Sequence, residues 1–389
     1  MSGRDLFCPP RRTRRGAALT LVFAGVLMAG AATGSFPDAG QPARRSAAGP
    51  APAATRHEDV RRAAAEAMAD GTSPMEAAER AVSRSGDRWG AVYSEGEYQE
   101  FQEALDGRYT GVGLSAARAQ DGRIEVTRVQ SGSPAAAAGI RAGDVLSSVD
   151  GSKVDGLPVT EVVSLLRGDA DDAPAGTSVT LGLRRGTRAW TETLHRASLS
   201  TDSVTVHRLP DGVTAIKIAA FTRGSGDAVR EAVREAPAGG GIILDLRGNS
   251  GGLVTEAVDT ASAFLDGGLV ATYDVDGAQR ALRADSGGDT VRPLVALVDG
   301  GTMSAAEMLT GALQDRGRAV VIGCRTFGKG SVQMPTRLPD GSVAELTVGH
   351  YRTPLGHAVD GRGITPDLEA GTGALQRAET VLTGLGDPS

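Results

Sequence analysis

Residues Leu294 to Gln333 read LVALVDGGTMSAAEMLTGALQDRGRAVVIGCRTFGKGSVQ, and the rest of the chain is organised around them. This stretch begins with an apolar run, Leu294 to Val298, which ends at Asp299-Gly300-Gly301 and is typical of a buried strand followed by a turn. Good helix formers dominate from Ser304 to Gln314, and apolar residues recur there three and four positions apart, so we expect an amphipathic helix. Ser304 therefore lies at or beside a helix start.

A second strand is expected at Ala319 to Gly323, and the loop Thr326 to Gly330 follows it with a lysine between two glycines. Such a loop lets the backbone turn sharply and direct Lys329 back at its surroundings. A serine is a weak nucleophile at its ordinary pKa and needs a base beside it. A lysine serves as that base only where burial lowers its pKa enough to leave it neutral. The stretch thus favours a Ser304–Lys329 pair.

Both residues also have structural interpretations. Ser304-Ala-Ala-Glu307 fits the capping box of a helix start, and Gly-Lys-Gly on its own is usually a loop with a solvated charge. The combination favours a site, because both residues follow neighbouring strands at the same end of an expected α/β sheet, where sites tend to lie.

A competing nucleophile is Ser250. It lies in Gly248-Asn249-Ser250-Gly251-Gly252, which satisfies the G-x-S-x-G pattern and follows the apolar run Ile242 to Leu246. A hydrolase built on Ser250 needs a histidine base and a carboxylate later in the chain. The candidates for these two roles are His350, His357, Asp360 and Asp367.

From Asp202 onward the pattern alternates between strands and helices, which predicts an α/β fold with a mostly parallel sheet. Strands are expected at Val213–Phe221, Gly241–Leu246 and Leu269–Val275, with helices at Ala228–Glu235 and Thr255–Phe264 between them. Two later strands joined by Pro339-Asp340-Gly341 read as a hairpin.

The start of the chain is typical of an exported protein. Arg11, Arg12, Arg14 and Arg15 form a positive stretch before the uncharged run Ala17 to Ala32. This run is too short for a comfortable membrane span, so residues 1–34 are expected to be a cleaved signal peptide or a membrane anchor. Residues 35–55 are rich in alanine, proline and glycine and are expected to be a disordered linker. Of the two cysteines, Cys8 lies in the N-terminal segment that would be removed or remain cytoplasmic, and Cys324 ends a strand, so no disulfide is expected.

Two modules are expected between the linker and the α/β part. Residues 56–106 are alanine-rich and amphipathic and should form an N-terminal helical region. Residues 107–199 contain the turn Tyr109-Thr-Gly-Val-Gly-Leu114 and the later run Ser133 to Gly151. A glycine-flanked turn can direct backbone N–H groups at a carboxylate, and an open strand edge beside it can accept an extended peptide. The glycines also fit a tight turn without a ligand.

These features together resemble the carboxyl-terminal processing peptidases, also called tail-specific proteases. Thr302-Met-Ser-Ala-Ala-Glu307 and Gly328-Lys-Gly-Ser-Val-Gln333 are similar to the family's T-A-S-A-S-E and G-K-G-x-x-Q signatures, with Ala306 where a second serine is common. The resemblance implies that Ser304 is the nucleophile, Lys329 the base and Gln333 the residue that orients the lysine. It also implies an oxyanion hole from the backbone N–H groups of Gly251 or Gly252 and of Ala305, at the positive end of its helix.

The same resemblance identifies residues 107–199 as a PDZ domain and residues 200–389 as the peptidase core. The implied carboxylate-binding residues are Tyr109, Gly111, Val112, Gly113 and Leu114. The family commonly has proline where Ser250 stands, which argues against Ser250 as the nucleophile.

The expected function is therefore an exported serine endopeptidase of bacterial type that binds the C-terminal tails of protein substrates and cleaves through an acyl-enzyme. It would be secreted or anchored to the outer face of the cytoplasmic membrane through its N-terminal segment, with a homo-oligomer as an option. No cofactor or metal is expected, and the net charge of −6 gives no basic footprint for nucleic acid. The alternatives are a Ser250 hydrolase and a PDZ binding protein without catalysis.

Overall fold

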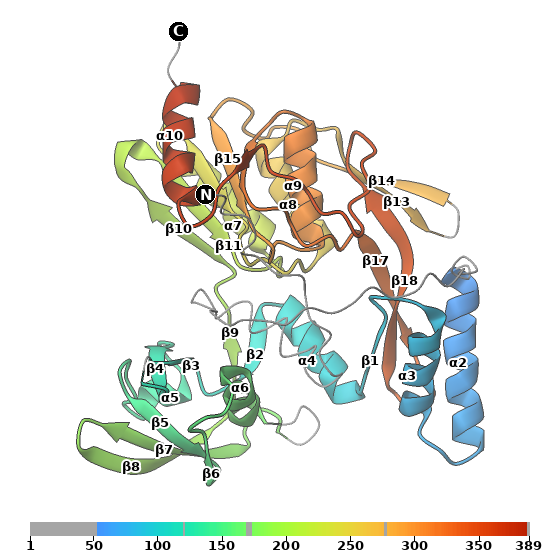
Figure 1. The fold of residues 1–389 in the computed structure, drawn as a ribbon, viewed down its shortest axis with the longest axis vertical. Coiled ribbons are helices and arrows are strands. Elements are labelled where there is room, and N and C mark those ends of the chain that lie inside the picture. The colour runs from blue at the N-terminus through green and yellow to red at the C-terminus, as the bar shows by residue number, and fades with distance from the viewer. Residues whose placement is uncertain (1–52, 120, 169–172, 276–277, 387–389) are drawn as a thin grey trace, which may run out of the picture.

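The computed structural model describes residues 53–119, 121–168, 173–275 and 278–386 (Figure 1). The expected signal segment, residues 1–34, and the linker residues 35–52 lie outside them. The linker prediction is wrong for residues 53–55, because helix α2 already begins at Ala53 and runs to Ala69. Alanine is the best helix former, so the alanine-rich end of the linker extends the helix. None of the helices among the described residues is long and apolar enough to cross a bilayer.

The N-terminal region consists of α2, α3 (Pro74–Ser85), β1 (Ala91–Tyr93) and α4 (Glu95–Leu105). Ser73 caps α3, whose first residue is Pro74, and a capping box at Ser94 begins α4, so both starts follow the sequence signals for helices. The strand β1 was not expected within a purely helical region. Helices α2 and α3 bury their apolar sides against strand β18 of the core, which attaches this region firmly to the rest of the protein.

The next region has the strands and helices of a small β domain. Its main sheet has the order β3-β4-β5-β7-β8, with β6 paired to β5, and β2 pairs separately with β9. Helix α6 closes the side of the sheet next to the edge strand β3. The bounds are β2 Arg108–Gly111, β3 Leu114–Arg118, β4 Ile124–Val129, α5 Pro134–Ala137, β5 Val145–Val149, β6 Ser152–Lys153, α6 Val159–Arg167, β7 Ser178–Arg185, β8 Arg188–His195 and β9 Ala197–Ser200.

The core is a three-layer α/β sandwich. Its sheet has the order β10-β11-β12-β15-β16-β19, and all neighbours are parallel except β10 and β11. Helices α7, α8 and α9 cover one face and α10 covers the other. The bounds are β10 Val204–Arg208, β11 Thr214–Ile218, α7 Ser225–Arg234, β12 Ile242–Asp245, α8 Val254–Phe264, β15 Leu294–Val298, α9 Ala305–Asp315, β16 Val320–Gly323, β19 Leu368–Glu369 and α10 Ala374–Gly386.

A second, antiparallel sheet departs from the expected alternation. Strand β13 (Leu269–Val275) has the predicted bounds, yet it pairs with β14 (Ala278–Arg283) and β18 (Val343–Arg352) instead of joining the parallel sheet. Strand β17 (Ser331–Arg337) forms the predicted hairpin with β18. Because β18 also pairs with β1, this sheet links the core to the N-terminal region. The α/β prediction is confirmed, with sheets of mixed direction.

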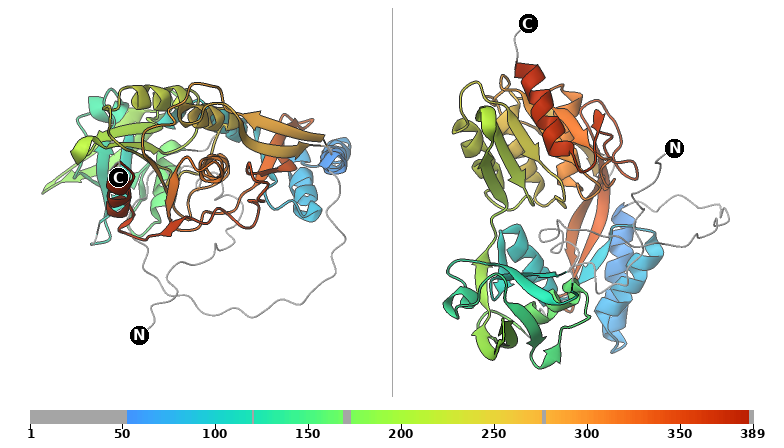
Figure 2. Two further views of the ribbon diagram at one scale, coloured as in Figure 1. Left: turned by 90° about the horizontal axis from the view of Figure 1, so that it is seen from above. Right: turned by 60° about the vertical axis from the view of Figure 1, so that its left-hand side comes forward.

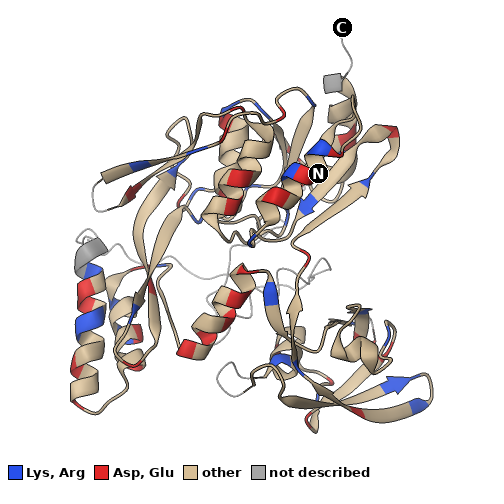
Figure 3. Cartoon of the chain, turned by 180° about the vertical axis from the view of Figure 1, so that it is seen from behind, with Lys and Arg blue, Asp and Glu red and all other residues tan. Residues whose placement is uncertain are grey.

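The PDZ-like region and the N-terminal helices extend from the same end of the core, and the C-terminus lies at the other end (Figure 2). Helix α4 lies between them, with Tyr98, Phe101 and Leu105 facing a cleft. Its acidic residues are visible along the helix in Figure 3; they are Glu95, Glu97, Glu100 and Glu103. Helical spacing places these acids largely on the side away from the cleft.

Candidate active site

Ser304 occupies a sharp turn between β15 and α9. Its backbone has φ 57° and ψ −120°, and it is one of three residues other than glycine with positive φ in the described chain. Such a conformation costs about 1–3 kcal/mol and persists only where the surroundings enforce it. A strained turn from strand to helix is also how a nucleophile is presented at the top of an α/β sheet.

Glu307 connects this turn to the lysine loop. Its buried carboxylate accepts the Ser304 N–H at 3.0 Å, the Thr326 hydroxyl at 2.5 Å, the Gly328 N–H at 2.7 Å and the Lys329 N–H at 2.8 Å. Burial raises the pKa of Glu307, and these four hydrogen bonds oppose that rise. The capping pattern in the sequence is thus present, and the same side chain fixes the loop that carries Lys329.

Tyr351, on β18, holds the same two segments from another side. Its hydroxyl oxygen lies 2.8 Å from the Ser304 carbonyl oxygen and 3.1 Å from that of Lys329, so its one proton is shared between two acceptors. Burial raises the pKa of Tyr351, which keeps the hydroxyl protonated as a donor. Sequence reasoning missed this residue, because a tyrosine in a strand carries no local signal of a partner elsewhere.

The Lys329 side chain is half-buried and lines the same cleft as Ser304. Burial lowers the pKa of Lys329, while the carboxylates of Glu345, Asp87 and Glu307 oppose that shift. Its Nζ lies 5.5 Å from the ring centre of Trp89. The described residues show no hydrogen bond between Lys329 Nζ and Ser304 Oγ, and catalytic contacts are often long before substrate binds.

Gly251 and Gly252 lie directly beside Ser304. A β-carbon at position 251 would lie 2.9 Å from the Ser304 Cβ, and one at position 252 would lie 2.3 Å from the Phe221 carbonyl oxygen, so only glycine fits at either position. The Gly251 N–H donates to Asn249 Oδ1 at 2.8 Å and is therefore not available to an oxyanion, which corrects its expected role as a donor. Within the described chain, no protein acceptor is recorded for the N–H groups of Gly252 and Ala305.

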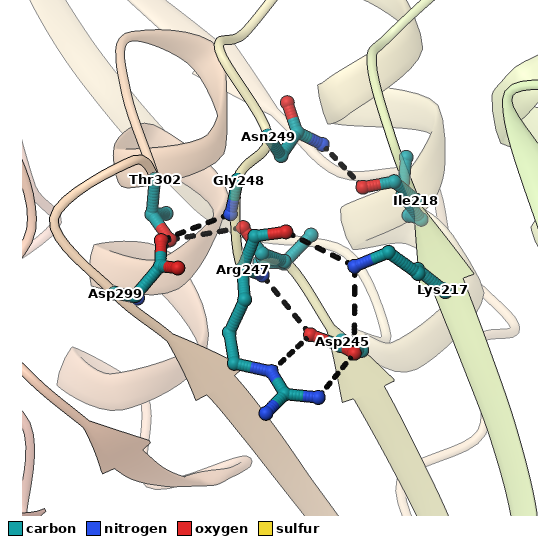
Figure 4. Close-up of polar contacts among 9 residues, drawn as sticks. Lys217, Ile218, Asp245, Arg247, Gly248, Asn249, Asp299 and Thr302 are labelled. Atoms are coloured by element: carbon teal, nitrogen blue, oxygen red, sulfur yellow. Dashed lines mark hydrogen bonds and ion pairs between the residues drawn. The ribbon is translucent and has the colours of Figure 1, made fainter. Parts of the chain in front are cut away.

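A polar network fixes the loop that carries these glycines (Figure 4). Asp245 accepts both Nε (2.8 Å) and a terminal nitrogen (2.7 Å) of Arg247, and Lys217 Nζ lies 3.5 Å from the same carboxylate. Burial alone would raise the pKa of Asp245, but Arg247 and Lys217 outweigh it and hold that pKa below its usual range. Gly248 N–H donates to Asp299 at 2.9 Å, which joins this loop to the turn before Ser304.

The histidines do not support Ser250 as a nucleophile. His350 Nε2 lies 3.7 Å from Asp360 and His357 Nδ1 lies 3.4 Å from Asp315, so both have carboxylate partners. Ser250 lines the cleft, but no histidine does so among the described residues. The base that a Ser250 hydrolase requires is therefore absent from this lining. Asp367, the other expected acid, binds the Val321 N–H and Gln314.

Gln333 lines the cleft near the lysine loop, but its side-chain amide donates to Ser331 Oγ at 2.7 Å. No hydrogen bond joins Gln333 to Lys329 in the described part of the chain, so its orienting role stays a prediction. Cys324 is half-buried, with its sulfur 3.6 Å from the Ala370 carbonyl oxygen, which agrees with a packed residue. No cluster of three or more His, Cys, Asp or Glu suited to a metal occurs within the ranges described.

One cleft of about 1030 Å³ brings the two halves of the predicted site together. Ser304, Lys329, Gly252 and Ala305 line it on the core side. The five predicted tail-binding residues line it on the PDZ-like side; they are Tyr109, Gly111, Val112, Gly113 and Leu114. Strand β3, which begins at Leu114, is an edge strand with α6 beside it, and an edge strand is where an extended peptide can add to a sheet.

The peptidase family S41 profile matches residues 212–370, and the PDZ domain profile matches residues 125–185. The chain is 36% identical over 314 residues to the chloroplastic carboxyl-terminal-processing peptidase 3 of Arabidopsis thaliana, covering 76% of this chain and 60% of that protein. It is 32% identical over 303 residues to a probable CtpA-like serine protease of Staphylococcus haemolyticus, with the same two coverages. The chain spans 55–60% of the length of the chloroplastic relatives it matches.

Solved structures agree with these matches. The photosystem II D1 C-terminal processing protease has a TM-score of 0.50 and 29% identity, covering 81% of this chain and 86% of that one. A putative S41 protease of Bacteroides fragilis has a TM-score of 0.54 at 18% identity, covering 81% and 91%, which shows the shared fold. The S41 match covers most of the α/β core and the PDZ match covers most of the small β domain, so the chain contains a peptidase family S41 core together with a PDZ domain.

Proposed function

We propose that this protein is a serine endopeptidase that binds the C-terminal tail of a protein substrate with its PDZ domain and cleaves the chain at Ser304. One observation carries this proposal: the tail-binding turn and the Ser304 turn line the same cleft. A tail bound along β3 would thus lead into the cleft in an extended form.

In the proposed acylation step, neutral Lys329 takes the proton of the Ser304 hydroxyl as Oγ attacks the carbonyl carbon of the scissile bond. The N–H groups of Gly252 and Ala305 donate to the oxyanion, and one such donor contributes about 3–4 kcal/mol. Protonated Lys329 then gives its proton to the leaving amine, and the C–N bond breaks. Water attacks the acyl-enzyme with Lys329 again as base and releases Ser304.

The proposal is tested with a folded reporter protein that ends in an unstructured apolar tail. We expect the unmodified protein to shorten the reporter, as read by intact mass, and Ser304→Ala to leave it uncut. Ser250→Ala is the matched control, because Ser250 lines the same cleft, and it should still cut. A serine-directed covalent probe should label Ser304 alone. Cleavage by Ser304→Ala with loss in Ser250→Ala would reverse the assignment.

A further inference from the structure

The bend between α3 and β1 is held in place by Asp87. Its carboxylate accepts the N–H groups of Trp89 at 3.1 Å and of Gly90 at 3.0 Å. It also accepts the N–H and the hydroxyl of Thr347 on β18, each at 2.7 Å. Hydrogen bonds to a charged group each contribute about 1.5–3 kcal/mol, so the bend is fixed firmly against the core.

Trp89, at the tip of this bend, is linked to the lysine loop on both sides of Lys329, directly through Phe327 and indirectly through Asp360. Before the lysine, its ring packs against Phe327 with centroids 5.7 Å apart and a tilt of 53°. After the lysine, its indole N–H donates to Asp360 Oδ1 at 3.2 Å, and the same oxygen accepts the Gly330 N–H at 3.2 Å. A β-carbon at position 330 would lie 2.4 Å from the Asp360 nitrogen, so the loop fits this contact only with glycine there.

The ammonium end of Lys329 lies over the face of the Trp89 ring, with Nζ 5.5 Å from its centre. Lys329 lines the cleft, whereas Trp89 is not among the described residues that line it, so the indole contacts the lysine from outside this lining. The charged groups that also act on Lys329 are Glu345 from β18, Asp87 from the bend and Glu307 from α9. Arg88 stacks on the indole with its guanidinium carbon 4.5 Å from the ring centre.

We propose that Trp89 is a positioning residue for Lys329, whose indole keeps water from the rear of the amine and holds the side chain facing the cleft; this rests on the proposed role of Lys329 as the base. An aromatic face within about 6 Å attracts a cation, which favours the charged amine, while its bulk excludes solvent, which favours the neutral amine. Solvent exclusion outweighs the attraction here, because burial is the main cause of the lowered pKa of Lys329. Removing the ring admits water behind Lys329, which restores part of the solvation that burial took away. The N-terminal region then contributes directly to the chemistry in the core.

The first test compares the pH dependence of kcat/KM in three variants. In Trp89→Ala we expect kcat to fall about 10- to 100-fold, as for a misplaced catalytic group, with KM nearly unchanged. The acid limb of the profile, where kcat/KM falls as the pH is lowered, should also shift to a pH about one unit higher, because a solvated amine holds its proton more tightly. Trp89→Phe keeps the ring and loses only the bond to Asp360, so its profile should resemble that of the unmodified protein.

Trp190→Ala is the matched control, because Trp190 is the other tryptophan of the chain. It lies on the PDZ hairpin β7–β8, where the guanidinium groups of Arg185 and Arg188 contact its ring. Trp190→Ala should leave the pH dependence of kcat/KM unchanged. A Trp89→Ala protein that loses rate while keeping the original acid limb would overturn the proposal, since a purely structural role predicts that result.

The second test does not depend on proteolysis. In Trp190→Phe the only remaining tryptophan is Trp89, so its fluorescence reports on the charge above the ring. We expect a transition between about pH 6 and pH 11, the range below and up to the ordinary pKa of a lysine. Adding Lys329→Met should abolish the transition, and adding His350→Asn, which removes the histidine beside Asp360, should keep it.

The two tests separate the two proposals. A transition that requires Lys329, in a protein that cuts no reporter, would leave the Trp89–Lys329 contact standing and refute the proposed peptidase. Absence of any transition in Trp190→Phe, or a transition that survives Lys329→Met, would overturn the role of Trp89 even in an active enzyme.

Discussion

The turn that carries Ser304 and the loop that carries Lys329 are built in different ways. The turn belongs to a single βα unit, in which β15 leads into α9 and the capping residue Glu307 is three positions away. The loop 326–330 has no regular structure, and its partners come from α9, from β18, from residue 360 and from the bend at Trp89. The proposed nucleophile is thus placed largely by its own βα turn, with Tyr351 as a distant support, whereas the proposed base is placed mainly by residues that are distant in sequence.

The sharpest test of this difference is Lys329→Arg. The guanidinium stays protonated at all usable pH values, so it cannot accept the Ser304 proton, and we expect kcat to fall at least about 10³-fold. Lys153→Arg, an exposed change on β6, is the control and should keep full activity. Turnover above a few per cent in a folded Lys329→Arg protein would contradict the assignment.

The same lysine sets the expected pH dependence. Only the neutral amine accepts a proton, and burial lowers the pKa of Lys329, so kcat/KM should rise with pH and level off below the ordinary lysine range. A rate that falls as the pH rises from neutral would contradict a lysine base. Stopped measurements of reporter cleavage across the pH range supply the curve.

The next largest effect is expected for Glu307→Gln, which tests the link between the turn and the loop. An amide keeps one acceptor oxygen and places an NH₂ group against N–H donors, so we expect a loss of about 2–4 kcal/mol of folding free energy and about 10²-fold in kcat. The control is Glu256→Gln, since Glu256 also accepts two backbone N–H groups, from Gly224 and Gly226, away from Lys329. It should lower the thermal midpoint with kcat retained. Equal loss of kcat in both variants would contradict the specific link.

A smaller effect on kcat/KM is expected from a change at the end of the substrate tail. Replacing its terminal carboxylate by an amide removes the charge that strengthens hydrogen bonds from the turn at Gly111 to Gly113, so kcat/KM should fall about 10-fold. At saturating substrate the two tails should be cut at equal rates, because binding is separate from the chemistry at Ser304. Equal cleavage of both tails well below saturation would refute tail recognition by this turn.

The smallest effect concerns strain at Ser304. Glycine tolerates its φ of 57°, whereas alanine does not, so Ser304→Gly should be more stable than Ser304→Ala by about 1 kcal/mol in chemical unfolding. Ser250, which is not among the residues with positive φ, supplies the control: there the glycine variant should be the less stable one. The same order of stabilities at both positions would show that the Ser304 turn is unstrained.

Much of the fold was predictable because its signals are local. The bounds of β15, the helix at α9 and the β17–β18 hairpin follow from apolar periodicity and turn residues close in the chain. The sheet to which β13 belongs did not follow from its sequence, since an apolar run shows that a strand is buried but not which strand it pairs with. Its antiparallel partner β18 lies far along the chain.

The residues of the site also differ in how far the sequence predicts them. Ser304, Lys329 and the glycines at 251 and 252 stand in recognisable motifs, and the structure brings them to one cleft. Trp89, Asp360 and Tyr351 have no such pattern, because their partners are set only when the chain has folded. The loss of Gly251 as a donor likewise depends on the Asn249 side chain, whose direction no spacing rule predicts.

The contact between Asp87 and Thr347 joins residues that are 260 positions apart, and this has a consequence during synthesis. A ribosome adds about 5–20 residues per second, so roughly 13–52 s separate the appearance of these two residues. For most of that interval β1 lacks its partner strand, and the amine of Lys329 has not yet been made. Because Trp89 and Lys329 come from segments that are synthesised so far apart in time, the proposed active site is complete only after both segments have been made and have folded together.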